Sequence, residues 1–245
     1  MAGKFTTERR DKTLSSLTVT TAPPRPLEDP LAHLPCSTIL GYRKGQIIYS
    51  RGQPSTNIYL VIDGKVKICR QAEDGRQVVV DIYGSDEFFG ESAFLGPGRR
   101  GEISQAIEDT KLMTWTTTEI EEISARRHRL AIAFLQLLAK RSRDFESRIE
   151  DFSLDDVPRR LASALIRFAE RLGNEPNTNS SGSVEIMLFT QELLSQYVGC
   201  RREAATKYMN RFRRQGYLNY SRKGMVIHLG LLKEWLKKPG SPTAF

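Results

Sequence analysis

The chain has 245 residues, of which 39% are hydrophobic, and a formal net charge of +8. It has no apolar run near the roughly 18 residues that a membrane span needs, and its N-terminus lacks the hydrophobic core of a secretory signal. The three cysteines and three histidines are dispersed, so neither a disulfide framework nor a metal site is predicted, and the sequence does not identify a cofactor. We expect a cytoplasmic protein that is long enough for two domains with separate cores.

The positive charge is concentrated at one end of the chain. Residues 190–245 hold 11 Lys/Arg and 3 Asp/Glu, whereas residues 1–189 hold 26 of each kind. A basic segment joined to a neutral one indicates a nucleic-acid-binding end and a second domain with another task. A solvated basic surface and a membrane surface are the alternatives. No basic amphipathic stripe carries exposed Trp, Phe or Leu anchors, so no membrane partner is expected.

Residues 1–37 are polar and rich in proline, which predicts an extended or disordered arm. From residue 38 to about 116, alternating segments separated by glycine turns predict a sandwich or barrel, with Asp-Gly hairpin signals at positions 63–64 and 74–75. The expected strands are Gln46–Tyr49, Asn57–Ile62, Lys65–Arg70, Gln77–Tyr83, Ile103–Ile107 and Leu112–Trp115. A capping box of Thr118 and Glu121 is expected to open a short helix after them.

A long helix is predicted from about residue 127 to 152. Its residues at alternating spacings of four and three form an a/d seam over three heptads. The seam consists of Ala131, Leu135, Leu138, Ser142, Phe145, Ile149 and Phe152. The charged residues around it include Lys140, Arg141, Arg143 and Arg148. A narrow seam flanked by charge favours a two-stranded dimer over a single helix that packs on its own barrel. The predicted dimer contacts are Leu135, Leu138, Phe145 and Ile149.

Residues 190–216 read TQELLSQYVGCRREAATKYMNRFRRQG and have the layout of a helix–turn–helix. Gly199 occupies the tight turn, and the second helix has apolar residues at spacings of three and four. Six Lys/Arg against one acid between residues 201 and 214 favour a DNA-reading face over an ordinary helical hairpin. The candidate DNA contacts are Arg201, Arg202, Glu203, Thr206 and Lys207.

Further elements flank this hairpin. Asp156 and Pro158 are suited to the cap and first turn of a helix that ends near residue 173. A strand is expected at Val184–Phe189. Two more strands, Tyr217–Tyr220 and Met225–Leu229, predict a wing that carries two basic residues at its tip near a phosphate backbone. These tip residues are Arg222 and Lys223.

Three segments carry a resemblance to a known family. GYRKGQIIYSRGQPSTNIYLVIDGKVKI and DEFFGESAFL look like the cyclic-nucleotide-binding β-roll, and VGCRREAATKYMNRFRRQG looks like the family's recognition hairpin. In this order of parts, residues 38–236 closely resemble the catabolite-activator/fumarate-nitrate-regulator (Crp/Fnr) family of bacterial transcription factors. The resemblance implies an α+β chain with an N-terminal cyclic-nucleotide-binding-like β-roll (38–126), a long dimerisation helix (127–152) and a C-terminal winged helix–turn–helix (153–245).

The resemblance implies a homodimeric, sequence-specific transcription regulator and not an enzyme. Its expected partners are double-stranded DNA with a palindromic operator, a second copy of the chain, RNA polymerase and a small-molecule effector. Arg202, Glu203 and Lys207 match the family positions that read base edges, which suggests half-sites like the family's TGTGA. A nucleotide-binding regulatory module without a DNA target is one alternative, but it leaves residues 190–216 unexplained. For an enzyme, the sequence lacks a nucleophile–base signature, a phosphate-binding loop and metal spacing.

The effector contacts are also implied by the resemblance. Gly90 and Glu91 match the family's Gly-Glu pair, and Arg100 matches its phosphate-binding Arg if the intervening loop is one residue shorter. These three residues are the candidate ligand contacts, because amides at a helix start can bind an anion and a carboxylate can accept from a ribose hydroxyl. A structural turn with an ion pair between Glu91 and Arg100 is the alternative, and we favour it.

Departures from the family pattern concern two of the three contact groups. Gly101 stands where the family has the phosphate-side Ser, and Glu102 beside it is negatively charged. At the other end of the site, Phe145 and Glu146 replace the Thr-Ser pair that contacts the purine. The predicted effector is therefore not cAMP, and a cAMP-responsive regulator is kept as the alternative.

Overall fold

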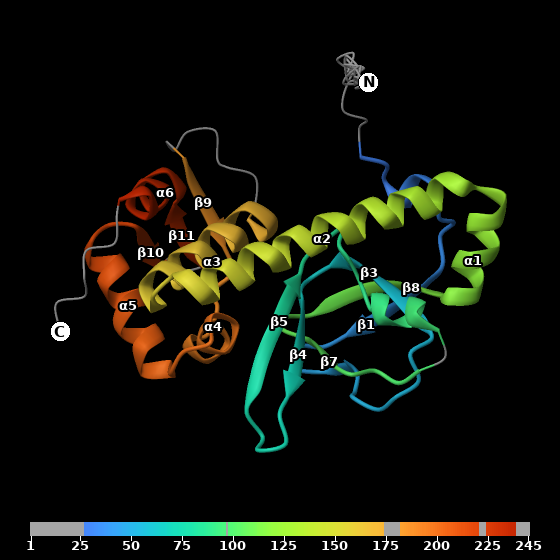
Figure 1. Ribbon diagram of the computed structural model, residues 1–245, viewed down its shortest axis with the longest axis horizontal. Coiled ribbons are helices and arrows are strands. Elements are labelled where there is room, and N and C mark those ends of the chain that lie inside the picture. The colour runs from blue at the N-terminus through green and yellow to red at the C-terminus, as the bar shows by residue number, and fades with distance from the viewer. Residues whose placement is uncertain (1–26, 97, 174–181, 221–223, 239–245) are drawn as a thin grey trace, which may run out of the picture.

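The computed structural model describes residues 27–96, 98–173, 182–220 and 224–238 (Figure 1). The N-terminal half is a β-roll of two four-stranded antiparallel sheets, with strand orders β1-β8-β3-β6 and β2-β7-β4-β5. Its strands are β1 (Thr38–Tyr42), β2 (Ile47–Tyr49), β3 (Asn57–Asp63), β4 (Val66–Gln71), β5 (Gln77–Tyr83), β6 (Phe88–Phe89), β7 (Ile103–Ala106) and β8 (Thr110–Thr116). Apolar side chains from both sheets, such as Val61 and Leu112, meet in the interior and are fully buried.

The six strands predicted from alternation are confirmed to within about two residues at each end. Gly64 makes the β3–β4 turn possible, because its φ is +87° and a Cβ there would lie 2.4 Å from the carbonyl oxygen of Asp109. Two further strands were not predicted. β1 contains a glycine and is defined by five pairs with β8, and β6 is only two residues long, so neither has a usable alternation of its own.

Two helices follow the β-roll, α1 (Thr117–Arg126) and α2 (His128–Leu154). The capping box predicted at Thr118 and Glu121 is wrong by two residues. Thr116 and Glu119 form it instead: the Thr116 N–H donates to Glu119 Oε2 at 2.7 Å, and the Glu119 N–H donates to Thr116 Oγ1 at 3.2 Å. The sequence offers both registers, and the strand decides between them because β8 remains paired with β3 as far as Thr116.

Residues 27–37 have a defined structure, so the prediction of an extended or disordered arm is wrong for them. The rest of the predicted arm, residues 1–26, lies outside the described residues. Pro30–Ala32 form a 3₁₀ helix, labelled η1, that is capped by Asp29. The Glu28 N–H donates to Gln136 Oε1 on α2 at 2.7 Å, and Trp115 Nε1 donates to the Pro35 carbonyl at 3.0 Å. Leu31 and Leu34 also pack against the apolar core of the β-roll and hold the segment in place. Proline-rich composition alone does not indicate these contacts.

In its described residues, the C-terminal module combines four helices with a three-stranded sheet of order β10-β11-β9. Its elements are α3 (Val157–Leu172), β9 (Ser183–Ile186), α4 (Gln191–Val198), α5 (Arg202–Arg214), β10 (Leu218–Tyr220), β11 (Met225–His228) and α6 (Leu229–Lys237). The predicted cap is confirmed, because the Asp156 side chain accepts from the Arg159 N–H with Pro158 in the first turn. The strands of the wing pair antiparallel, as expected. No helix in the described ranges is long and apolar enough to cross a membrane.

Strand β5 joins the two halves of the molecule. Its Val79 and Ile82 side chains are fully buried in the same apolar cluster as residues of α3, α4 and the wing. Gly84, just after β5, lies so close to α3 that a Cβ there would sit 2.8 Å from Leu172 Cδ2. Figure 1 shows the C-terminal module beside this edge of the β-roll, with α2 running along both. The core of the C-terminal module is therefore completed by a strand of the β-roll.

We predict that Ile82→Ala destabilises the whole chain by about 2–5 kcal/mol, because it opens a cavity in this shared core. Val78→Ala on the same strand is the control: this side chain is 42% exposed, and the expected change is within about 0.5 kcal/mol. Urea denaturation followed by circular dichroism measures both. Equal losses for the two variants would show that the shared core does not hold the halves together.

Candidate DNA interface and effector pocket

The turn between α4 and α5 depends on a glycine. Gly199 has φ 68° and ψ 50°, in the left-handed region that non-glycine residues rarely adopt. A Cβ there would also lie 2.7 Å from the ring of Phe152 on α2. The Cys200 N–H closes the turn by donating to the Ser195 carbonyl at 3.0 Å. The predicted role of Gly199 is confirmed, and the structure adds a close approach from α2 as a second reason for it.

Helix α5 has one buried and one exposed face. Its buried side chains are Ala205, Met209 and Phe212, and Tyr208 is half-buried. Its exposed candidate residues are Arg201, Arg202, Glu203 and Lys207. None of these four forms an ion pair within the described part of the chain, so their charged groups are available to a ligand. Thr206 differs from them: it is half-buried, and its hydroxyl donates to the Arg202 carbonyl at 2.9 Å.

The start of α5 leaves backbone donors open. Arg201 occupies the N-cap position, and no side chain caps the first turn. The free N–H groups and the positive end of the helix dipole favour a negatively charged group there, such as a phosphate. The two predicted wing-tip contacts, Arg222 and Lys223, lie outside the described residues.

A cavity of about 380 Å³ lies between the β-roll and α2. Its wall includes Gly90, Glu91 and Ser92 at the short 3₁₀ helix η2 (Glu91–Leu95) and Leu138 and Phe145 on α2. Other lining residues are Tyr49, Ile68, Arg70, Val80, Tyr83, Phe94, Leu95 and Glu102. The cavity thus brings two of the three predicted ligand contacts together with two predicted seam residues.

Glu91 has a different partner from the one expected. Its Oε1 forms an ion pair with Arg141 Nη1 of α2 at 2.7 Å, and Arg141 Nη2 donates to the Phe88 carbonyl. The favoured ion pair between Glu91 and Arg100 is therefore wrong. Gly90 is in the left-handed region with φ 88°, so the turn before Glu91 is confirmed as one that favours glycine.

Arg100 is directed into the protein and is only 2% exposed. Its Nη1 donates to the Gly90 carbonyl at 2.8 Å and to Ser92 Oγ at 3.0 Å, while Nη2 donates to the Asn57 carbonyl. Its guanidinium also lies 4.3 Å from the centre of the Tyr49 ring. Because protein acceptors occupy both terminal nitrogens, this arginine holds the Gly90 turn and does not line the cavity.

Glu102 does line the cavity, beside the position expected for a phosphate. Its Oε1 accepts from Ser92 Oγ at 2.9 Å and from Tyr49 Oη at 3.4 Å. Burial raises the pKa of Tyr49 above its ordinary value, so the phenol stays protonated and can donate. On the opposite wall Phe145 presents an aromatic ring, whereas Glu146 is exposed and accepts from Ser142 within α2.

The predicted seam divides into two groups. Leu135 and Ile149 are 66% and 64% exposed, and the other exposed members are Ala131, Ser142 and Phe152. Leu138 and Phe145 are half-buried because they close the cavity. A single chain therefore leaves an apolar stripe uncovered along α2.

Two of the arginines that were expected among the charges around the seam, Arg141 and Arg148, are largely buried. The side chain of Arg141 is 12% exposed, and Arg148 is 9% exposed. Arg148 donates to the carbonyls of Val79 and Val80 on β5 and to that of Tyr197 on α4. Their spacing of seven residues places them on one face of α2, and this is the only sequence signal that pointed to a common environment. Within the described ranges, no group of His, Cys, Asp and Glu side chains is arranged to hold a metal ion.

Comparisons with known proteins agree with this architecture. Residues 39–127 match the family model of the cyclic nucleotide-binding domain, and residues 159–234 match that of the Crp-like helix-turn-helix domain. The CRP-like cAMP-activated global transcriptional regulator of Mycobacterium tuberculosis is 30% identical over 187 residues, which cover 76% of this chain and 82% of that protein.

Solved structures show the same fold. FixK2 from Bradyrhizobium japonicum aligns with a TM-score of 0.71 at 20% identity, covering 84% of this chain and 99% of that one. A transcriptional regulator of the CRP/FNR family from Thermus thermophilus aligns with a TM-score of 0.62 at 26% identity, covering 83% of this chain and 100% of that one. With its sensing β-roll and its winged helix–turn–helix in the same order, the chain belongs to the Crp/Fnr family of DNA-binding transcription regulators.

Proposed function

We propose that the chain acts as a homodimer that reads a two-fold-symmetric operator with α5. The observation that carries this proposal is the exposed charged face of α5 above a fully buried apolar face. Two recognition helices related by a dyad need half-sites about one helical turn, roughly 34 Å, apart. RNA polymerase is the further partner that we propose for the DNA-bound dimer.

The exposed side chains suit different parts of a DNA site. Arg202 and Lys207 are donors for guanine O6 and N7, and Glu203 is an acceptor for cytosine N4. Lys207 lacks the two-pronged geometry of arginine, so we assign it a weaker base preference. Arg201, beside the open amides of the first turn, is suited to a phosphate. The Thr206 hydroxyl already donates within the helix, so its contact with DNA would come from its methyl group or as an acceptor.

We predict that Arg202→Ala weakens binding to the selected operator by about 1–3 kcal/mol and relaxes the choice of one base pair. Arg201→Ala is the matched control: it should weaken operator and random duplexes alike and reduce the salt slope by about one. Fluorescence anisotropy titrations at several salt concentrations measure both effects. Equal weakening on operator and random DNA by Arg202→Ala would remove its base-reading role.

The proposed dimer interface is the uncovered stripe on α2. Leu135 and Ile149 are the best-exposed apolar residues among the four predicted contacts. Isolated exposed leucines are ordinary on protein surfaces, but these two lie on one seam with Ala131 and Ser142 between charged flanks. A second α2 packed along this stripe would cover it and would also lie next to Leu138 and Phe145, which line the cavity.

We predict that Leu135→Glu converts the dimer into monomers, because two unpaired carboxylates would face each other in the seam. Leu135 is preferable to Leu138 for this test, since Leu138 also closes the cavity. Arg143→Glu, at an exposed position on α2 off the seam, is the control and should remain dimeric. Sedimentation velocity reports the mass of each variant. A dimeric Leu135→Glu protein would exclude this stripe as the interface.

We further propose that the cavity beside Gly90 and Glu91 is the effector site and that cAMP is not its ligand. Arg100 directs three of its terminal N–H groups to Gly90, Ser92 and Asn57, and it does not line the cavity where a cyclic phosphate would bind. A second carboxylate, Glu102, lines the cavity where that phosphate would lie. An aromatic wall at Phe145 cannot donate a hydrogen bond to a purine, although it can stack on one.

A cAMP-responsive regulator is the second candidate. It is favoured by the similarity to the M. tuberculosis regulator, whose name describes it as cAMP-activated. The presence of Gly90 and Glu91 in the cavity wall is compatible with it.

We predict no micromolar binding of cAMP or cGMP to the dialysed protein. Each lost hydrogen bond to a charged or buried group costs about 1–3 kcal/mol, so two or three losses weaken binding by several orders of magnitude. Isothermal titration calorimetry, together with DNA affinity in the presence of each nucleotide, makes the measurement. Micromolar binding that also tightens DNA affinity would establish the second candidate.

A further inference from the structure

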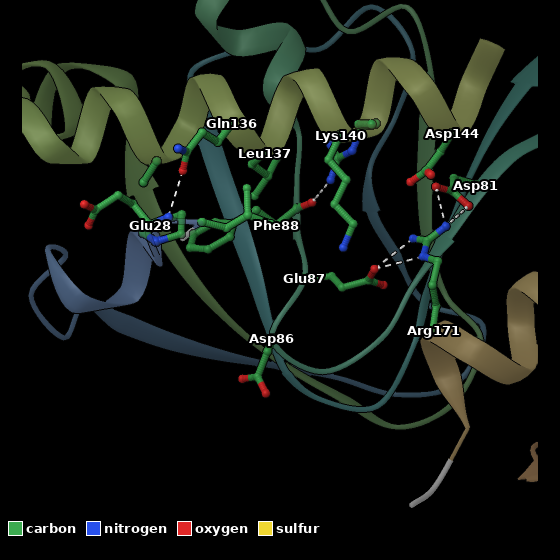
Figure 2. A pocket seen from close by; sticks show the side chains of 14 residues that line it. Glu28, Asp81, Asp86, Glu87, Phe88, Gln136, Leu137, Lys140, Asp144 and Arg171 are labelled. Carbon is green, nitrogen blue, oxygen red and sulfur yellow. Dashed lines mark hydrogen bonds and ion pairs between the residues drawn. The ribbon is translucent and has the colours of Figure 1, made fainter. Parts of the chain in front are cut away.

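A half-buried arginine connects the C-terminal module to the β-roll. Arg171, near the end of α3, reaches back to Asp81 on β5 and to Glu87 in the turn before β6, as the dashed lines in Figure 2 show. Its Nη1 lies 3.0 Å from both oxygens of Asp81, and its Nε and Nη2 lie 3.0 and 2.9 Å from Glu87 Oε1. The Asp81 side chain is only 6% exposed. This buried carboxylate therefore keeps its partner only while α3, which carries Arg171, remains packed against the β-roll.

Tyr83 lies between this contact and the effector cavity. Its ring is 2% exposed and forms part of the cavity wall. The Arg171 guanidinium is 5.9 Å from the ring centre, and the Arg141 guanidinium is 4.7 Å from it. Cations near an aromatic ring are attracted by the ring's quadrupole, so both arginines hold Tyr83 and are held by it.

Arg141 connects the Tyr83 ring to the cavity wall, because it forms an ion pair with Glu91. Contacts therefore run without a break from Glu91 through Arg141 and Tyr83 to Arg171 on the C-terminal module. Arg141 also lies near Asp81, because the side chains of Arg141, Asp81 and Arg171 line one further cavity. Burial acts to lower the pKa of Arg141, and the charges of Glu91 and Asp81 act to raise it. The two arginines thus share one aromatic ring and the field of one carboxylate.

We propose that Tyr83 is a positioning residue that couples the Glu91 end of the cavity to the docking of the DNA-binding module. The proposal rests on the assignment of this cavity as the effector site. When a ligand engages Glu91, Arg141 loses its carboxylate and must satisfy a buried charge elsewhere. Asp81 is the carboxylate already within its field, and a shift of Arg141 toward Asp81 displaces the Tyr83 ring and weakens the hold on Arg171.

A double-mutant cycle on the full-length chain tests this coupling. E91Q imitates loss of the Glu91 charge, and R171Q removes the docking cation. Glu91 and Arg171 do not contact each other, so independent sites would give additive free energies and multiplicative changes in Kd. We expect each single variant to change the Kd for the operator duplex in the same direction by at least about threefold, which is about 0.7 kcal/mol. The double variant should lie within about twofold of R171Q alone.

The control pair is E91Q with R167Q. Arg167 also belongs to α3, but it is paired with Asp151 on α2 and has no contact with Tyr83, so these effects should multiply. Y83F retains the ring and should retain the coupling, whereas in Y83L the E91Q change should have no further effect. Thermal melting identifies any variant that has failed to fold, and Y83F keeps the test informative if Y83L does so.

Hydrogen exchange of the backbone amides in β5 and at the end of α3 measures the same double-mutant cycle of E91Q and R171Q in the absence of DNA and effector. E91Q and R171Q should each raise exchange there, and the double variant should raise it no further than R171Q. This readout separates the coupling from the proposed operator and effector, because it needs neither. Multiplicative changes for E91Q and R171Q, unchanged β5 exchange in E91Q, or undiminished coupling in Y83L would each overturn the proposal.

Discussion

The arrangement of the whole chain depends on strand β5, which is buried by two modules at once. Its apolar side chains complete the C-terminal core, and its backbone carbonyls at Val79 and Val80 accept from Arg148 of α2. A buried guanidinium costs several kcal/mol unless nearby acceptors compensate for lost hydration. Because the docked arrangement supplies those acceptors, the strand and the arginine together fix where the C-terminal module lies.

Helix α2, which carries Arg148, also contacts other parts of the molecule through its different faces. An α-helix turns by about 100° per residue, so one rod presents different faces to different neighbours. Leu138 and Phe145 close the cavity, Leu135 and Ile149 face outward, and Phe152 packs against the turn that opens the recognition helix. The cavity, the proposed interface and the DNA-reading turn therefore share one backbone.

The parts of the fold that sequence reasoning predicted well are those with local causes. Alternation with period two located six strands, and Asp156 with Pro158 located the start of α3. Gly199 was identified because a tight turn requires a conformation that other residues avoid. The failures began where two local solutions competed. Thr116–Glu119 and Thr118–Glu121 are equally good capping boxes on paper, and only the pairing of β8 with β3 selects the first.

The sequence by itself determined the charged face of α5, the apolar stripe of α2 and the Gly90 turn, because periodicity and backbone conformation are properties of neighbouring residues. Only the tertiary structure decided which carboxylate each arginine meets. Glu91 pairs with Arg141 and not with Arg100, although Arg100 is nearer in the sequence. Asp81 pairs with Arg171 across a sequence separation of 90 residues. All carboxylates carry the same charge, so a sequence cannot rank them as partners. The packing of α2 and α3 against β5 makes that choice, since it alone sets the distances and excludes the water.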